Sequence, residues 1–148
     1  MILIIKRFSE LSVDELFEIY RLRVSVFVVE QVCPYQEVDL ADKAAYHVWF
    51  ENEEGIMAYA RVLPQNVVFP EVAIGRVIAV KRRSGLGTEI VKAAISVAEK
   101  ELHAEKITIE AQVYAEALYE KVGFRRISEE FLEDGIPHIR MQRQSFNR

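Results

Sequence analysis

The chain has 148 residues, of which 51% are hydrophobic and 28% charged, and its formal net charge is −4. This size predicts one globular domain spanning residues 1–148, and the negative charge argues against a nucleic-acid partner. A lone cysteine, Cys33, excludes an internal disulfide, and no cysteine or histidine spacing indicates a metal site. The apolar run in MILIIKRF is too short for a secretion signal or a membrane span, so we expect a cytoplasmic protein without a membrane partner.

The N-terminal third predicts a strand at residues 2–8 and then a helix. Ser12 and Glu15 form a capping box at the start of this helix. Its core-facing stripe recurs at spacings of four, four and three and consists of Leu16, Tyr20, Val24 and Phe27. Arg23 lies on the flank of the stripe, so it either points inward along a cleft or snorkels to solvent.

The loop after this helix carries Glu37, Asp39 and Asp42, which predict an acidic rim able to hold amines. Two strands at residues 46–51 and 56–63 follow, joined by Asn52-Glu53-Glu54-Gly55 as a hairpin. His47 lies on the first of these strands and Arg61 on the second, and both are candidates for the acceptor side of a site.

The stretch from residue 74 to 91 runs from a strand through Arg82-Arg83-Ser84-Gly85-Leu86-Gly87 into an amphipathic helix. Strict alternation along the strand, residues 72–80, puts Ile74, Arg76 and Ile78 on one face. The helix N-terminus has free N–H groups, and glycine lets its backbone approach a phosphate, so the turn predicts a pyrophosphate cradle. The alternative is that the two glycines only form a tight turn. The patterns of a P-loop and of GxGxxG are absent.

The helix continues to residue 102, and residues 106–112 predict a strand parallel to the one before the helix. Ligands in such units bind beyond the carboxyl ends of the strands, here beside residues 78–88 and Gln112. A short helix at residues 115–121, a strand at 124–128, a turn at Asp134-Gly135 and a last strand at 136–143 complete the prediction.

This order of elements resembles the GNAT superfamily of acyl-CoA-dependent acetyltransferases. Three motifs carry the resemblance: Arg82-Arg83-Ser84-Gly85-Leu86-Gly87, Ile74-Gly75-Arg76-Val77, and Gln112…Ala115…Leu118-Tyr119…Gly123-Phe124. The flanks, which include Gln31, Cys33-Pro34-Tyr35 and Asp134-Gly135-Ile136-Pro137-His138, resemble the ElaA-like branch. The resemblance implies an α/β (α+β) fold with a mixed central sheet of about seven strands and helices on both faces. This chain departs from the pattern in a link before Arg82 that is about three residues short and in Gln112, where asparagine is commoner.

The resemblance implies an N-acetyltransferase in which Tyr119 faces the sulfur of acetyl-CoA and gives a proton to the leaving thiolate. The amides of residues 83–88 would hold the pyrophosphate, and the open edge of residues 78–80 would pair with pantetheine. The expected cofactor-binding residues are Ile78, Ala79, Val80, Arg82, Arg83, Ser84, Gly85, Leu86, Gly87, Thr88, Gln112 and Tyr119. Tyr119 could instead be a core aromatic residue, and Cys33 a buried apolar one.

The acceptor is expected to be an amine of a small molecule or of a protein, attacked directly in a ternary complex. No single residue is assigned as the base. Glu110 and Gln112 share a strand face, and the other candidates, which could line the acceptor side, are His47, His138, Glu37 and Asp39. The expected acceptor-binding residues are Arg23, Phe27, Glu37, Asp39, His47 and Arg61. Exposed edge strands would permit a homodimer.

Two other functions fit parts of the pattern. Arg23, Phe27, the acidic loop and Arg61-Val62-Leu63-Pro64 also resemble acyl-homoserine-lactone synthases, in which these residues would hold S-adenosylmethionine. A non-enzymatic acyl-CoA-binding domain would keep the glycine turn and have no use for Tyr119. Formation of a lactone tests the first alternative, and the activity of a Tyr119→Phe variant tests the second.

Overall fold

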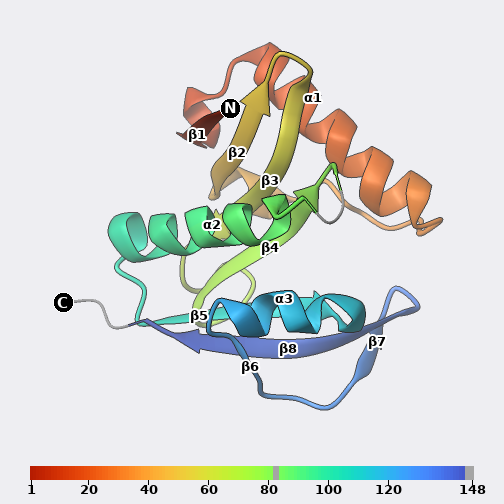
Figure 1. The fold of residues 1–148 in the computed structure, drawn as a ribbon, viewed down its shortest axis with the longest axis vertical. Coiled ribbons are helices and arrows are strands. Elements are labelled where there is room, and N and C mark those ends of the chain that lie inside the picture. Colours follow the sequence, from red (N-terminus) through yellow and green to blue (C-terminus); the bar gives the residue numbers. More distant parts are fainter. Residues whose placement is uncertain (82–83, 146–148) are drawn as a thin grey trace.

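The computed structural model describes residues 1–81 and 84–145. Its centre is an eight-stranded sheet in the order β1-β2-β3-β4-β5-β8-β6, with β7 paired to β8 (Figure 1). The β4–β5 pair is parallel and the others are antiparallel. The strands are β1 (Ile2–Arg7), β2 (Tyr46–Asn52), β3 (Gly55–Leu63), β4 (Val72–Ala79), β5 (Lys106–Gln112), β6 (Arg125–Arg126), β7 (Phe131–Glu133) and β8 (Ile136–Gln144).

Helices cover both faces of the sheet, as predicted (Figure 1). On one face α1 (Val13–Val24), which begins at the predicted Ser12–Glu15 capping box, packs Ile19 against Trp49, Tyr59 and Ile78. On the other face α2 (Leu86–Leu102) and α3 (Glu116–Lys121) enclose the larger core. Shorter helical turns are η1 (Phe8–Glu10), η2 (Ser25–Glu30), η3 (Leu40–Lys43) and η4 (Val113–Ala115). In the described parts of the chain, no helix is long and apolar enough to cross a bilayer.

Strand β4 contains a β-bulge that the sequence pattern did not predict. Tyr59 faces Ile78 and Arg61 faces Gly75, so a single residue of β3 lies opposite two residues of β4. The bulge reverses the facing of the β4 residues beyond it, and Ile74 therefore packs under α2 whereas Ile78 packs under α1. The expectation that Ile74 and Ile78 share a face is wrong for this reason.

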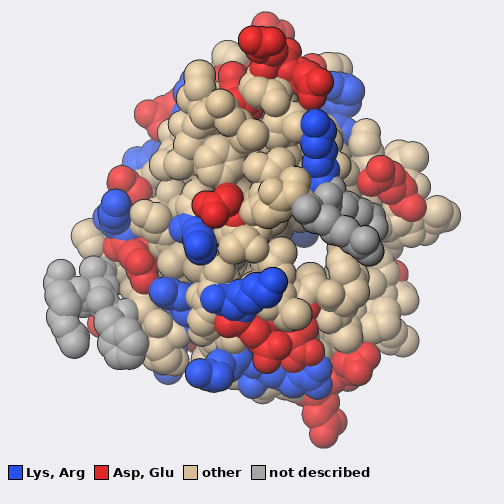
Figure 2. Space-filling view, in the orientation of Figure 1, with Lys and Arg blue, Asp and Glu red and all other residues tan. Residues whose placement is uncertain are grey.

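Pairing between β4 and β5 ends early. The two strands are paired only at Val72–Ile107 and Ala73–Thr108, at the beginning of both strands. Beyond these pairs the strands separate, and Figure 2 shows that the surface is hollowed between the part built on β1–β4 and the part built on β5–β8. A parallel sheet that opens toward the carboxyl ends of its strands provides the crevice in which α/β proteins bind ligands.

The C-terminal elements differ slightly from the prediction. Asp134 and Gly135 both have positive φ, at 51° and 78°, and this turn joins β7 to β8. The three residues of β7 are the strand that the prediction lacks. The expected strand at residues 124–128 is limited to Arg125 and Arg126, which pair with β8.

Candidate active site

The first turn of α2 leaves backbone N–H groups without intrahelical acceptors. Gly85 precedes the helix at a φ of 82°, which glycine adopts without strain, and it provides no side-chain cap. Its carbonyl accepts a hydrogen bond from the Glu89 N–H at 3.1 Å. Among the described residues, the N–H groups of residues 86–88 have no acceptor outside the helix, and the helix dipole adds positive potential there. Such an N-terminus is suited to a phosphate or diphosphate.

Gly87 has a packing role as well. A Cβ built on it would lie 2.9 Å from Leu118 Cδ1, so glycine allows α3 to pack against the first turn of α2. Ser84 donates a hydrogen bond from Oγ to the Lys81 carbonyl at 2.7 Å, which orders the turn. The predicted contributions of Arg82 and Arg83 lie outside the described residues. The packing explanation therefore holds at Gly87, and the ligand-binding explanation of this turn stays a prediction.

Among the described residues 78–80 at the end of β4, one has a backbone edge without a partner. Val80 donates its N–H to the Met57 carbonyl at 2.9 Å, and Ile78 is paired with Tyr59 of β3. Alternate residues of an antiparallel strand direct their backbone groups to opposite sides. Of the three residues predicted to pair with pantetheine, Ala79 therefore directs its N–H and C=O away from β3, toward the space between β4 and β5.

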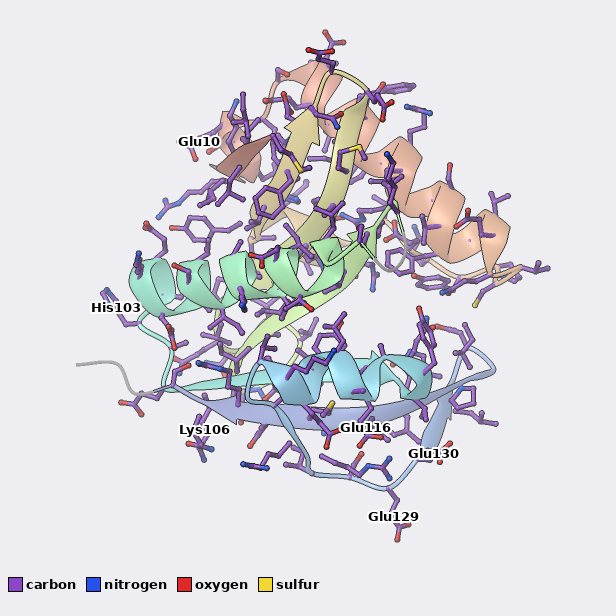
Figure 3. The ribbon with its side chains drawn as sticks, in the orientation of Figure 1. Glu10, His103, Lys106, Glu116, Glu129 and Glu130 are labelled. Atoms are coloured by element: carbon purple, nitrogen blue, oxygen red, sulfur yellow. The ribbon has the colours of Figure 1, made fainter. Side chains whose placement is uncertain are left out.

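Tyr119 lies on α3 and is 8% exposed. Its ring packs edge-on against Phe124 with centroids 5.8 Å apart. Within the described residues its hydroxyl makes no hydrogen bond. Burial, and then the proximity of Tyr114, raises the pKa of Tyr119 well above its ordinary value, so the hydroxyl is protonated at neutral pH. The labelled Glu10, His103, Lys106 and Glu129 extend outward from the periphery (Figure 3).

Contacts at the carboxyl end of β5 join the two parts of the sheet. The side-chain amide of Gln112 exchanges two hydrogen bonds with Gln31, at 3.3 and 3.4 Å. Nearby, Cys33 Sγ donates to the Asp134 carbonyl at 3.4 Å. The segment after α1 is thereby held against the β5–β8 part. Gln112 lies directly opposite His138 on β8.

His138 has one ring nitrogen that can accept a proton. Its Nδ1 lies 2.7 Å from the Ile136 carbonyl oxygen, which can only accept, so the proton is assigned to Nδ1 and the lone pair to Nε2. The ring stacks on Phe131 with centroids 6.2 Å apart, and Nε2 lies 3.8 Å from Glu133 Oε2. Burial, and then the neighbouring Glu110, raises the pKa of Glu133.

Arginines and carboxylates form a network in the interior beside α1 and β3. Arg23 is 0% exposed and bonds Glu37 at 2.9 Å and Asp42 at 2.7 Å. Arg61 bonds Asp39 at 2.7 Å and Asp42 at 3.0 Å. Burial acts to raise the pKa of Asp42, but the hydrogen bonds and charges of Arg23 and Arg61 outweigh it and hold that pKa below its ordinary range.

His47 is part of the same interior. Its Nε2 lies 2.9 Å from the Asp42 carbonyl oxygen and its Nδ1 lies 2.7 Å from the Tyr59 hydroxyl. The carbonyl must receive a proton from Nε2, so Nδ1 accepts from Tyr59 and the neutral ring satisfies both bonds. Burial lowers the pKa of His47, which keeps the ring neutral.

The expectation of an acidic rim is wrong at two of its three carboxylates, because Glu37 and Asp42 are only 2% and 1% exposed. Buried carboxylates require charged partners, and the arginines of α1 and the sheet supply them. The structure brings together five of the residues expected to bind the acceptor, but most of their bonds are to one another. Two of them, Arg23 and His47, have no exposed surface. These five are Arg23, Glu37, Asp39, His47 and Arg61, while Phe27 is partly buried in the core under α1.

Three residues that lie near the site were not predicted as site residues from the sequence. Gln31 bonds Gln112, Glu133 lies beside His138, and Arg76 joins the ion network from the bulge of β4. The signal for Glu133 was available, since the Asp134-Gly135 turn fixes the hairpin register that brings β7 beside His138. The partners of Gln31 and Arg76 are distant in sequence and had no local signal.

Comparison with known proteins identifies the class. A family model described as an acetyltransferase (GNAT) domain matches residues 13–145. The chain therefore belongs to the GNAT acetyltransferase family, whose members include acyl-CoA N-acyltransferases.

Individual relatives narrow the assignment within this family, and they confirm the resemblance to the ElaA-like branch. A UPF0039 protein of Schizosaccharomyces pombe is 41% identical over 141 residues, which cover 93% of each chain. The crystal structure of Escherichia coli ElaA matches with a TM-score of 0.90 and 33% identity, covering 97% of this chain and 99% of that one. A crystal structure of an acyl-CoA N-acyltransferase from Pseudomonas aeruginosa matches with a TM-score of 0.89, 36% identity and the same coverage.

Proposed function

We propose that this protein transfers an acetyl group from acetyl-CoA to an amine by direct attack in a ternary complex. One observation carries the proposal: where β4 and β5 separate, the uncapped N-terminus of α2 lies next to strand backbone with no partner of its own. A long ligand with a diphosphate at one end and amides along its arm matches that combination.

The residues present fit such a ligand. The N–H groups of residues 86–88 would bind the diphosphate, and the positive φ of Gly85 shapes the backbone around it. The N–H and C=O of Ala79 would pair with the amides of the pantetheine arm, as an added strand pairs with a sheet edge. Gln112 at the end of β5 would border the acyl group.

Bound acetyl-CoA supplies an acyl thioester. The protonated hydroxyl of Tyr119 has no competing hydrogen bond within the described residues, so it is available to donate a proton to the sulfur. A primary amine with a pKa of about 10.4 is protonated at neutral pH and must lose a proton before it attacks. His138 would accept that proton at Nε2, directly or through a water.

The structure favours this proposal over the alternatives. Cys33 is 6% exposed and its Sγ is engaged with the Asp134 carbonyl, which argues against an acyl-enzyme. The residues that would hold S-adenosylmethionine in a lactone synthase are paired with one another in the interior. A domain that only binds acyl-CoA would have no use for the protonated Tyr119 on α3, whose Leu118 packs against the first turn of α2.

Two measurements on the purified protein test the proposal. Calorimetry should detect binding of coenzyme A, and acetyl-CoA with a panel of amines, including a diamine, an aromatic monoamine and a lysine peptide, should release free thiol with at least one acceptor. Absence of binding heat with coenzyme A would exclude the proposal. Binding without thiol release from any acceptor would favour the non-enzymatic alternative, and a lactone formed with S-adenosylmethionine would favour the synthase.

A further inference from the structure

Arg76 occupies a backbone conformation that a non-glycine residue adopts at a cost. Its φ is 53°, and it lies within the β4 bulge between the residues that pair with Arg61 and Tyr59. Residues held at positive φ persist where surrounding contacts compensate for the strain. We therefore expect contacts that stabilise the positive φ of Arg76, near the point where β4 separates from β5.

The side chain of Arg76 makes those contacts with a single loop. Its Nε lies 2.7 Å from Glu37 Oε2, and its Nη2 donates to the Glu37 carbonyl at 2.9 Å and to Asp39 Oδ2 at 3.4 Å. The guanidinium lies over the Tyr35 ring, 5.5 Å from its centroid. The Arg76 side chain is 20% exposed and Glu37 is 2% exposed, so these charges are weakly screened by solvent.

The bulge determines where the end of β4 points. Pairing of β4 with β5 stops at Ala73, before the bulge, and the free edge at Ala79 lies just after it. An added residue bends the bulged strand and increases its twist. The contacts of Arg76 therefore act on the segment of β4 that would border the pantetheine arm.

We propose that Arg76 is a positioning residue for acyl-CoA: its bonds to Glu37 and Asp39 hold the β4 bulge, which keeps the end of β4 apart from β5 and so exposes the Ala79 edge. The inference rests on the proposed acetyl-CoA-dependent function. It differs from a purely structural role, in which Arg76 would only balance the buried carboxylates. The two roles can be distinguished, because loss of a positioning role lowers the affinity for acyl-CoA, whereas loss of a purely structural role lowers the stability alone.

The test uses Arg76→Gly and Arg76→Lys in the full chain. Glycine accepts the positive φ but lacks the ion pairs, and lysine keeps the charge without the forked contact to the loop. The matched control is Arg21→Ala, which removes an exposed ion pair with Glu18 at 2.7 Å. We expect the dissociation constant for coenzyme A to rise about tenfold in Arg76→Gly, less in Arg76→Lys, and to be unchanged in Arg21→Ala.

The outcomes distinguish failure of this inference from failure of the proposed function. If the wild type binds coenzyme A and Arg76→Gly binds it equally well, Arg76 does not position the site, even if the variant is less stable. If Arg76→Gly does not fold, Arg76→Lys decides by the same comparison. If the wild type itself does not bind coenzyme A, the proposed function fails, and amide hydrogen exchange then tests the bulge. Faster exchange confined to residues 77–80 in the variants would support it, and unchanged exchange there would overturn it.

Discussion

Tyr119 and His138 contribute different proton-transfer groups to the proposed reaction. Tyr119 holds a proton because burial raises its pKa, and His138 has a free lone pair because its other nitrogen is bonded to the Ile136 carbonyl. Neither assignment depends on a metal or on a covalent intermediate. A substitution at either residue should therefore remove one of the two proton-transfer functions.

The Tyr119→Phe variant should lose turnover and keep its affinity for coenzyme A. Loss of a general acid lowers kcat about a hundredfold or more. Stability should be unchanged, because the hydroxyl makes no hydrogen bond within the described residues. Steady-state thiol release and calorimetry measure the two quantities. Tyr114→Phe is the matched control, since Tyr114 is 78% exposed in the same segment, and a Tyr119→Phe variant as active as this control would disprove the role.

His47 predicts how stability depends on pH. Its pKa in the folded protein lies below the unfolded value of about 6.5, so the unfolded chain binds more protons below that pH. The contribution of His47 to the free energy of unfolding is therefore fully present above about pH 6.5, and it is lost as the pH falls from there toward the pKa of His47 in the folded protein. Asp39 and Asp42, whose folded pKa values are also lowered, add a second loss below about pH 4.

The His47→Gln variant isolates the first of these effects. Glutamine does not titrate, so its free energy of unfolding should change less between pH 7 and pH 5 than that of the wild type, although it is lower at pH 7 by about 1–3 kcal/mol. Urea unfolding at a series of pH values measures this. Equal slopes for the two proteins over that interval would mean that His47 is not the titrating group.

At the scale of elements, the start of α2 combines a turn that contains a glycine at positive φ with a helix that has no side-chain cap. Gly85→Ala should lower the free energy of unfolding by about 1–2 kcal/mol, because alanine is disfavoured at a φ of 82° even though a Cβ there meets nothing within 4 Å. Gly75→Ala is the control, since its Cβ also meets nothing and its φ is not positive. Chemical denaturation compares them. Equal stability of the two variants would show that the positive φ of Gly85 is not the cause.

Some elements could be predicted from the sequence, and others could not. The capping box at Ser12, the hairpin glycine at Gly55 and the C-terminal glycine at Gly123 are local signals, and each marks an element found in the structure. The β4 bulge has no such signal, because the alternation around Arg76 is typical of a regular strand, and the side-chain contacts that Arg76 makes in the irregular conformation are with residues 35–39. A local pattern therefore does not predict strain that a distant loop compensates.

At the scale of the molecule, the same limit applies to charge. Glu37 and Asp42 read as a solvated acidic rim, yet arginines from α1 and β3 bury them. The family and the order of elements apart from β7 were predicted from motifs and periodicity, and the mixed sheet with helices on both faces followed from the resemblance to the family. The division of the sheet into two parts, joined by two β4–β5 pairs and by the Gln31–Gln112 contact, required the three-dimensional structure.

The central claim is that acyl-CoA binds where these two parts separate. A titration of the isotopically labelled protein with coenzyme A, followed by amide chemical shifts, tests it most directly. We expect the largest shifts at the amides of residues 86–88 and at Ala79. Shifts concentrated elsewhere, for example beside Tyr20 and Lys43 at the cavity of about 570 Å³, or no shifts at all, would contradict it.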